Sequence, residues 1–176
     1  MHRRWIEWTP ARTLFGIDLR TLALFRVLLG FYVLFDLVLR ARDLTAHYAD
    51  QGIMPRAVQI GQLNSGSWSL HLANGAAFFQ GLLFALAALV AVGLIIGWRT
   101  RLMTALSWAL LLSVQNRNTF ILSGEDNLAL LLMFWAMFLP IGARYSLDRA
   151  LSRTRDYPDN AYFSVATFAL LIQGMS

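Results

Sequence analysis

A short polar stretch carries the residues of this chain that are best suited to chemistry. Asn116, Arg117 and Asn118 are followed closely by Glu125 and Asp126. A carboxylate can act as a general base when its pKa lies near the working pH, and a guanidinium can hold an oxyanion or a carboxylate. Glu125, Asp126 and Arg117 are therefore the candidate catalytic residues, with one of the two carboxylates as the base.

The same stretch predicts an ion pair. A guanidinium suits bidentate binding of a carboxylate, so we expect Arg117 to be held by Glu125 or Asp126 across the turn between two helices. Alternatively, Glu125 and Asp126 only cap the helix that follows, whose N-terminus favours negative charge. Both can hold if each carboxylate has a different role.

Two apolar runs flank this stretch. A membrane-spanning helix needs about 20 residues, which carries the helix that begins at Arg101 to around Phe120. Asn116, Arg117 and Asn118 would then lie in the outer part of the hydrocarbon, where polar groups usually face protein or a water-filled cavity. We expect them to line a cavity that opens toward the outer leaflet. The alternative is that the helix ends earlier and the polar residues form an ordinary loop.

Composition places the chain among membrane proteins. Of its 176 residues, 57% are hydrophobic and 14% are charged, whereas a soluble domain is about a quarter charged. Cysteine is absent, which excludes disulfides and thiolate metal sites. The net charge of +5 comes without a basic run interleaved with aromatic residues, so nucleic acid is not an expected partner. We predict an all-α polytopic transmembrane helix bundle in contact with the lipid bilayer.

The hydrophobic pattern divides the chain into two parts. Residues 1–18 are expected to form an interfacial segment, because tryptophan favours the membrane interface. Residues 19–176 form the predicted transmembrane helical domain. Its five predicted spans, the last of them cut off at the end of the chain, are residues 19–39, 76–96, 101–120, 127–142 and 161–176.

Arginine placement predicts the orientation. With a cytoplasmic N-terminus, more arginines fall in inside segments than in outside segments, as the positive-inside rule requires. The polar segments 47–74 and 115–126 then share the outer side, which favours a common external site.

The first predicted span contains two charges, Arg26 and Asp36. About 15 Å of helix rise separates them, so they cannot pair with each other. Asp36 can reach Arg40 one turn later. Arg26 either extends to the nearer interface or contacts polar groups of another span. The candidate ligand-binding residues are Arg26, Asp36, Asn116, Arg117, Asn118, Glu125 and Asp126.

A metal site is not predicted. His47 and His71 are the histidines nearest to the predicted outer side, and neither belongs to a pair with the i, i+4 spacing of helical metal ligands.

Five groups of residues form a series of motifs in order along the chain: 22–36, 48–52, 97–101, 116–118 with 124–126, and 139–148. This series resembles the HTTM (horizontally transferred transmembrane) domain family, which includes vitamin K-dependent gamma-carboxylase and many bacterial homologues. The resemblance runs from about Thr21 to Met175 and implies a multi-helix bundle of the bacterial inner membrane with polar outer loops.

One departure from the family bears on activity. The carboxylase uses a lysine base in the outer segment between its third and fourth spans, and this sequence contains no lysine. Arg117 is a poor substitute because a guanidinium stays protonated. Carboxylation of glutamate is therefore not expected. What the resemblance still implies is the scaffold and a hydrophobic ligand such as a quinone or a lipid.

Two functions follow from these observations. The first is a binding or assembly component of the membrane, for a quinone or lipid or for other membrane protein subunits. The alternative is a carboxylase-like or quinol-linked membrane enzyme with an outer-side active site around residues 116–126.

Overall fold

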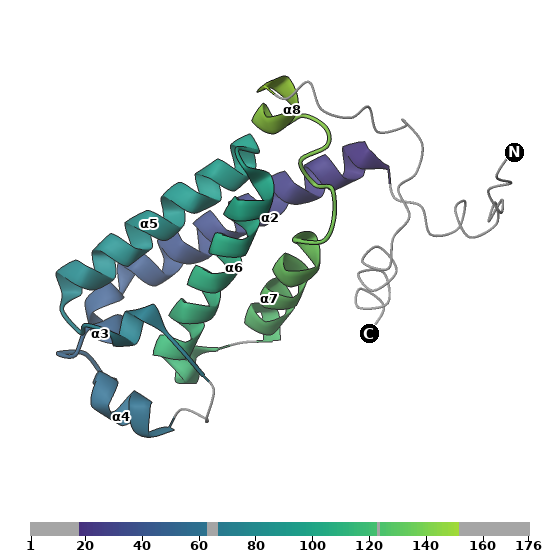
Figure 1. Ribbon diagram of the computed structural model, residues 1–176. Helices are drawn as coiled ribbons and strands as arrows, with labels where there is room; N and C mark the ends of the chain where they lie inside the picture. Colours follow the sequence, from purple (N-terminus) through teal and green to yellow (C-terminus); the bar gives the residue numbers. More distant parts are fainter. Residues whose placement is uncertain (1–17, 63–66, 123, 152–176) are drawn as a thin grey trace, which may run out of the picture.

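The computed structural model describes residues 18–62, 67–122 and 124–151, and all regular secondary structure in these ranges is helical (Figure 1). Four longer helices form the body: α2 (Leu19–Arg42), α5 (Ala77–Ile96), α6 (Thr100–Arg117) and α7 (Gly124–Ala136). The short helices are α3 (Leu44–Tyr48), α4 (Arg56–Gln62), α8 (Leu147–Leu151) and the 3-10 turns η1 (Leu70–Leu72) and η2 (Thr119–Ile121).

Helices α2 and α5 are long and apolar enough to cross a membrane, with 24 and 20 residues. They lie side by side and run in opposite directions (Figure 1). Gly30 permits the close approach, because a Cβ atom there would lie 3.2 Å from the backbone oxygen of Ala91. The predicted spans 19–39 and 76–96 agree with these two helices.

The end of α5 is set by its backbone. Gly97 adopts a left-handed conformation with φ of 78°. Its N–H bonds to the carbonyls of Gly93 and Leu94, and the N–H of Trp98 bonds to Gly93. This is a Schellman ending, which satisfies the last carbonyls of a helix. The chain can therefore reverse at once, and α6 begins at Thr100.

The predicted bounds of the next two spans differ from the structure. Helix α6 ends at Arg117, short of residue 120. Helix α7 covers 13 residues, Gly124–Ala136, where a span over 127–142 was predicted. After α7 the chain tightens into i→i−3 turns through Leu139. Pro140 cannot donate the hydrogen bond that would continue a helix, which explains the early end.

Two predicted elements lie outside the described residues. These are the interfacial segment, apart from Asp18, and the fifth span at 161–176. Asp18 caps α2, since its carboxylate accepts a hydrogen bond of 2.9 Å from the N–H of Arg20.

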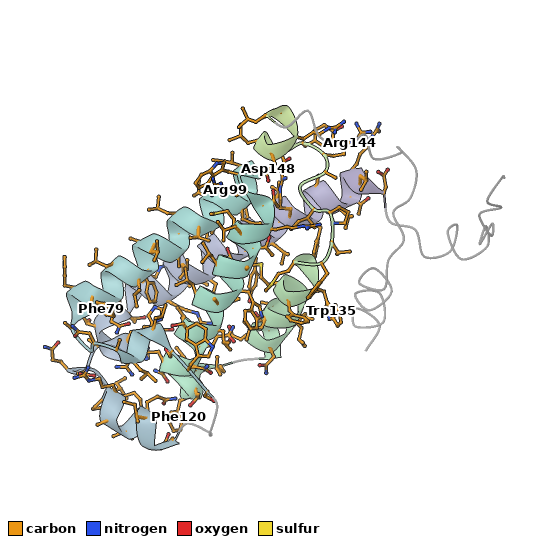
Figure 2. All side chains as sticks on the ribbon, in the orientation of Figure 1. Phe79, Arg99, Phe120, Trp135, Arg144 and Asp148 are labelled. Atoms are coloured by element: carbon orange, nitrogen blue, oxygen red, sulfur yellow. The ribbon has the colours of Figure 1, made fainter. Side chains whose placement is uncertain are left out.

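The two ends of the bundle carry different polar contacts (Figure 2). Phe120 lies at the end that contains α3 and α4, and Arg99 and Asp148 lie at the opposite end. The Asp148 carboxylate accepts hydrogen bonds of 2.7 Å from the N–H groups of Arg99 and Thr100 and of 2.8 Å from the Thr100 hydroxyl. Asp148 thus supplies the hydrogen-bond acceptors that the N–H groups at the start of α6 need, although it lies far from them in the sequence.

Arg26 fixes α2 to the segment that follows α7. Its guanidinium is buried and donates to the carbonyl of Tyr145 at 2.6 Å and to that of Ile141 at 3.4 Å. We predicted that Arg26 either contacts polar groups of another span or extends to the nearer interface. Its polar partners are instead backbone carbonyls of the segment that follows α7, and its side chain is buried.

Candidate functional site

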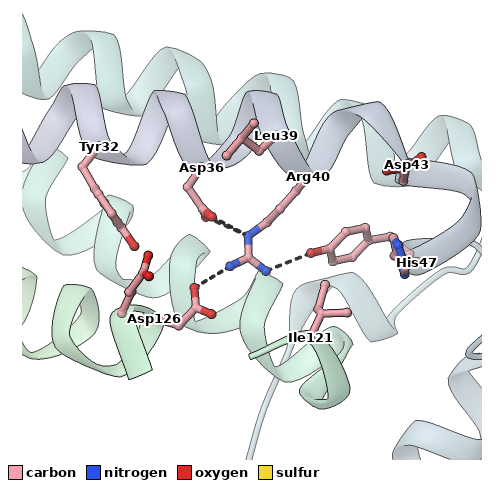
Figure 3. Close-up of a pocket in the computed structure, with 10 residues that line it drawn as sticks. Tyr32, Asp36, Leu39, Arg40, Asp43, His47, Ile121 and Asp126 are labelled. Carbon is pink, nitrogen blue, oxygen red and sulfur yellow. Dashed lines mark hydrogen bonds and ion pairs between the residues drawn. The ribbon is translucent and has the colours of Figure 1, made fainter. Parts of the chain in front are cut away.

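Arg40 is the centre of a charged cluster that we call the Arg40 clamp, made of Asp36, Arg40, Tyr48 and Asp126 (Figure 3). Its Nε lies 2.8 Å from both carboxylate oxygens of Asp36. Its Nη2 donates to Asp126 at 2.5 Å, and its Nη1 donates to the hydroxyl of Tyr48 at 3.1 Å. One guanidinium thus joins α2, α3 and α7.

Local structure places each member of the clamp. Asp36 and Arg40 stand one turn apart on α2, so the predicted local pair is confirmed. Asp126 lies in the first turn of α7, where negative charge is favoured. Tyr48 ends α3 and packs edge-on against Phe84, with ring centroids 5.2 Å apart. Burial raises the pKa of Tyr48, so its phenol keeps its proton at neutral pH.

A polar pocket of about 300 Å³ opens beside the clamp. It contains four carboxylates, which come from α2, from the residue that follows α2 and from the first turn of α7. The full set of lining residues is Tyr32, Asp36, Leu39, Arg40, Asp43, His47, Tyr48, Ile121, Glu125 and Asp126.

An apolar groove of about 340 Å³ runs between α2 and α7. Tyr32 and Glu125 line both this groove and the polar pocket, so the two hollows are neighbours. The other residues that line the groove are Phe25, Leu28, Leu29, Leu128, Ala129 and Leu132.

From the apolar groove to the polar pocket, which together we call the combined hollow, one face of α2 and one face of α7 change from apolar to polar side chains. On α2 the side chains at three- and four-residue spacing run from Phe25 and Leu29 through Tyr32 to Asp36 and Arg40. This spacing keeps them on one side of the helix. On α7 the corresponding face runs from Leu132 through Leu128 and Ala129 to Glu125. The polar ends of both faces meet at the end of the bundle that carries α3 (Figure 1).

The predicted pairing of Arg117 is wrong. Arg117 is fully buried, donates to the carbonyl of Met54 at 3.0 Å, and has Nη2 3.5 Å from a carboxylate oxygen of Asp50. The carboxylate of Asp126 binds Arg40 instead. The last turn of α6 points Arg117 beneath the segment between α3 and α5, whereas Asp126 faces α2. Glu125 and Asp126 do lie in the first turn of α7, as the capping alternative predicted.

Asn116 and Asn118 hold the long connection between α3 and α5, and α3 itself, against the end of α6. Asn116 donates to the carbonyl of Trp68 at 2.9 Å, and Asn118 donates to that of His47 at 3.1 Å. The side-chain amide of Gln59 donates a hydrogen bond of 3.2 Å to the carbonyl of Asn116. These amides line neither the polar pocket nor the apolar groove.

His71 is a buried histidine that is neutral in the folded protein at pH 7. It is fully buried, and its Nδ1 lies 2.7 Å from the hydroxyl of Ser113. Burial, aided by the positive charge of Arg117, lowers the pKa of His71 to about 4. The imidazole is therefore neutral at pH 7. Across the described residues, no three histidine or acidic side chains are grouped to hold a metal ion.

The structure brings together only part of the predicted site. Asp36, Glu125 and Asp126 meet at the polar pocket, whereas Arg26 lies toward the other end of α2. Sequence reasoning missed Tyr32 and Tyr48 and treated Arg40 only as the partner of Asp36. The four-residue spacing of Tyr32, Asp36 and Arg40 was the available signal.

Comparisons with known proteins leave the family resemblance as a prediction. No protein-family model, no curated protein and no solved structure matches the chain.

Proposed function

We propose that this chain is a multi-pass protein of the bacterial inner membrane that binds one amphipathic membrane ligand, a lipid or a quinone. The polar head of the ligand occupies the polar pocket, and its apolar tail occupies the groove between α2 and α7. The observation that carries the proposal is that the polar pocket and the apolar groove lie next to each other and share Tyr32 and Glu125 as lining residues.

Surface composition supports a membrane setting. Large apolar side chains stand exposed along both long helices, among them Phe35 on α2 and Leu89 on α5. Contiguous exposed apolar surface of this kind favours contact with lipid. The proposed topology has five spans and a cytoplasmic N-terminus, which puts the polar pocket at the outer surface. The HTTM resemblance is compatible with this arrangement.

The dimensions of the groove suit a membrane ligand. From Tyr32 to Phe25 the face of α2 descends about 10 Å along the helix axis. A head held at Tyr32 therefore leaves its tail directed into the hydrocarbon. Leu28 and Leu128 line the groove and are 57% and 46% exposed, so the groove opens sideways to the bilayer. A ligand can enter from the lipid phase without crossing water.

Binding is better supported than the enzymatic alternative. That alternative placed Arg117 in one site with Glu125 or Asp126, as oxyanion holder and base. Arg117 is instead engaged by Met54 and Asp50, and Asp126 is engaged by Arg40. Neither carboxylate therefore shares a site with Arg117, which the enzymatic alternative requires.

Native mass spectrometry of the purified full chain tests the proposal. We expect one amphipathic molecule to remain bound to the wild type and to be lost from Leu128→Trp, because the larger side chain fills the groove. Leu131→Trp is the matched control, since Leu131 lies on the same helix with the same 46% exposure and does not line the groove. Equal retention by both variants, with helix content unchanged, would refute the proposal.

A further inference from the structure

We propose that Arg117 and His71 form an internal binding site for a small anion of the carboxylate class. This site goes beyond the proposed function, since neither residue lines the polar pocket or the apolar groove. Arg117 is the last residue of α6, and His71 belongs to η1, which contacts α6. Both side chains are fully buried, so their polar atoms need partners inside the protein.

One edge of the Arg117 guanidinium lacks a hydrogen-bond acceptor among the described residues. Its Nη1 donates to the carbonyl of Met54 at 3.0 Å, whereas the buried Nε and Nη2 make no hydrogen bond. Nη2 lies 3.5 Å from a carboxylate oxygen of Asp50, which is an ion pair without a hydrogen bond. The N–H groups of Nε and Nη2 point the same way, and such a pair suits the two oxygens of a carboxylate.

His71 offers a third unpaired donor. The Ser113 hydroxyl oxygen accepts hydrogen bonds from the backbone N–H groups of Leu70 at 2.8 Å and of His71 at 3.3 Å. We assign its own proton to Nδ1 of His71, 2.7 Å away, which is nearer than the hydroxyl of Ser69 at 3.3 Å. The hydrogen of the neutral ring then sits on Nε2. Nε2 is buried and has no hydrogen-bond partner in the described part of the chain.

The fold brings these donors to one region of the core. Ser113 and Arg117 stand one turn apart on α6, which puts them on the same side of the helix with about 5–6 Å between their Cβ atoms. Ser113 holds the imidazole, so the ring of His71 lies next to the turn that carries Arg117. The positive charge of Arg117 accordingly contributes to lowering the pKa of His71. Two N–H groups of Arg117 and one of His71 thus need acceptors in the same region.

The charge around Arg117 is positive. Within the described ranges, the one carboxylate that pairs with Arg117 is Asp50, and Asp50 also pairs with Arg56, whose Nε lies 3.1 Å from it. Two guanidiniums therefore share one carboxylate, while His71 is neutral at pH 7. An uncompensated buried charge is costly, so one further negative charge beside Arg117 would stabilise the fold.

A carboxylate matches this set of groups better than water does. It accepts several hydrogen bonds, donates none and neutralises the excess positive charge. A water molecule has two protons to donate, whereas the three unpaired groups are all donors. Water suits the nearby Oε1 of Gln80, an unpartnered acceptor whose side-chain nitrogen donates to the carbonyl of His71 at 2.7 Å.

Burial limits the size of the anion and its route. The side chains of Arg117 and His71 are 0% exposed, so the anion is enclosed, which favours an acid of very few atoms. The side chains of Asp50 and Arg56 are 36% and 42% exposed. These two residues form the boundary between the site and the solvent, and an anion reaches Arg117 past them.

Titration of the full chain with sodium formate, the smallest carboxylate, tests the inference. Nitrogen-15 NMR of the protein in detergent follows the Nε–H group of Arg117 and the ring nitrogens of His71. We expect both signals to shift in a saturable way, with a dissociation constant near the limit of about 1 mM for a ligand of three heavy atoms. Sodium chloride at equal ionic strength should not reproduce the shifts. Arg117→Lys and His71→Gln identify the two signals by their loss, and either variant suffices if the other does not fold.

Two arginine variants provide a matched comparison. Arg56→Gln removes positive charge at the boundary and leaves Asp50 to Arg117 alone, so it should weaken formate binding about two- to fivefold. Arg20→Gln removes the same charge from the exposed first turn of α2, at the opposite end of that helix from α3, and should leave binding unchanged. Both side chains reach the surface, so both variants should fold.

Three results would overturn the inference. The first is the lack of a saturable shift of either signal with formate, which is also the outcome if water, or a carboxylate outside the described residues, already satisfies Arg117. The second is an equal response to chloride, and the third is equal weakening by the two arginine substitutions. The lipid or quinone site is tested separately by Leu128→Trp, so these results leave the proposed function untouched.

Discussion

At the scale of single residues, the Arg40 guanidinium decides how the polar end of the bundle is built. It is almost fully enclosed and is bonded to two carboxylates and a phenol. Buried ion pairs of this kind add little net stability over an apolar core, yet removal of one partner leaves an uncompensated charge. The Arg40 clamp is therefore a point of high sensitivity to mutation.

The two adjacent acids of α7 give a matched test of the clamp. Asp126→Asn should lower the free energy of unfolding by about 3 kcal/mol, because Arg40 loses a buried charged partner. Glu125→Gln should change it by less than about 0.5 kcal/mol, since Glu125 is exposed. Unfolding of the detergent-solubilised protein, followed by circular dichroism, measures both. Equal losses would show that Asp126 does not have this role.

His71 makes stability depend on pH. Its pKa is about 4 in the folded protein, against about 6.5 for an unfolded histidine. The unfolded chain therefore takes up a proton as the pH falls below about 6.5, and the folded state loses up to about 3 kcal/mol between there and pH 4. We expect His71→Gln to flatten this part of the pH profile of thermal unfolding. A variant profile parallel to that of the wild type would contradict the account.

Sequence reasoning succeeded at this scale where partners are local. Asp36 and Arg40 are one helical turn apart, so their pair could be predicted from spacing. The partner of Arg117 could not be predicted from spacing, because the chain could fold to bring either Asp50 or Asp126 against its guanidinium. The fold of the connection between α3 and α5, which spacing does not determine, makes the choice.

At the scale of elements, α6 depends on a cap from outside its own sequence neighbourhood. Asp148 accepts hydrogen bonds from the N–H groups of Arg99 and Thr100. Burial alone would raise the pKa of Asp148, but the hydrogen bonds from Thr100 and Arg99 outweigh it and hold the pKa below its usual value. The carboxylate thus stays charged and stabilises the start of α6 at neutral pH.

Loss of this cap should be measurable. Asp148→Ala should lower the free energy of unfolding by about 1–2 kcal/mol at pH 7, as for other capping residues. The loss should shrink as the pH falls below the usual pKa of aspartate and then through the lower pKa of Asp148 in the folded protein. The capping carboxylate stabilises the folded state only while it is charged. Asp43→Ala is the control, since Asp43 is exposed and makes no side-chain capping bond. A similar loss in the control would remove the capping explanation.

Element bounds were predictable where apolar runs end in a clear signal. Gly97 ends α5 in a left-handed turn, and the acidic Asp18 starts α2. Helix α7 was misplaced because the apolar run continues to Leu139, past the point where hydrogen bonding becomes irregular. Hydrophobicity alone does not separate a helix from the turns that precede Pro140.

At the scale of the whole molecule, the end that carries α3 and the end that carries α8 should face opposite sides of the membrane. The chain has no native cysteine, so single introduced cysteines report cleanly. Thr45→Cys should react with an impermeant maleimide from outside intact cells, whereas Tyr145→Cys should react only after permeabilisation. Both positions are exposed. Reaction of both from one side would contradict the proposed topology.

The helical class and the two long helices could be predicted from composition and hydrophobic runs. The combined hollow could not, because it depends on how α2 and α7 are turned toward each other. Periodicity shows which residues share a face of one helix, and it does not show which helix that face meets.

Solution NMR of the full chain tests most directly whether an amphipathic ligand lies between α2 and α7. Leucine methyl groups would be labelled in protein held in deuterated detergent, and short-chain phosphatidylethanolamine added. We predict chemical-shift changes at the groove residues Leu28, Leu29, Leu128 and Leu132, and none at Leu86 and Leu89 on the exposed face of α5. Equal shifts at all lipid-facing leucines, or no shift at the groove, would contradict the account.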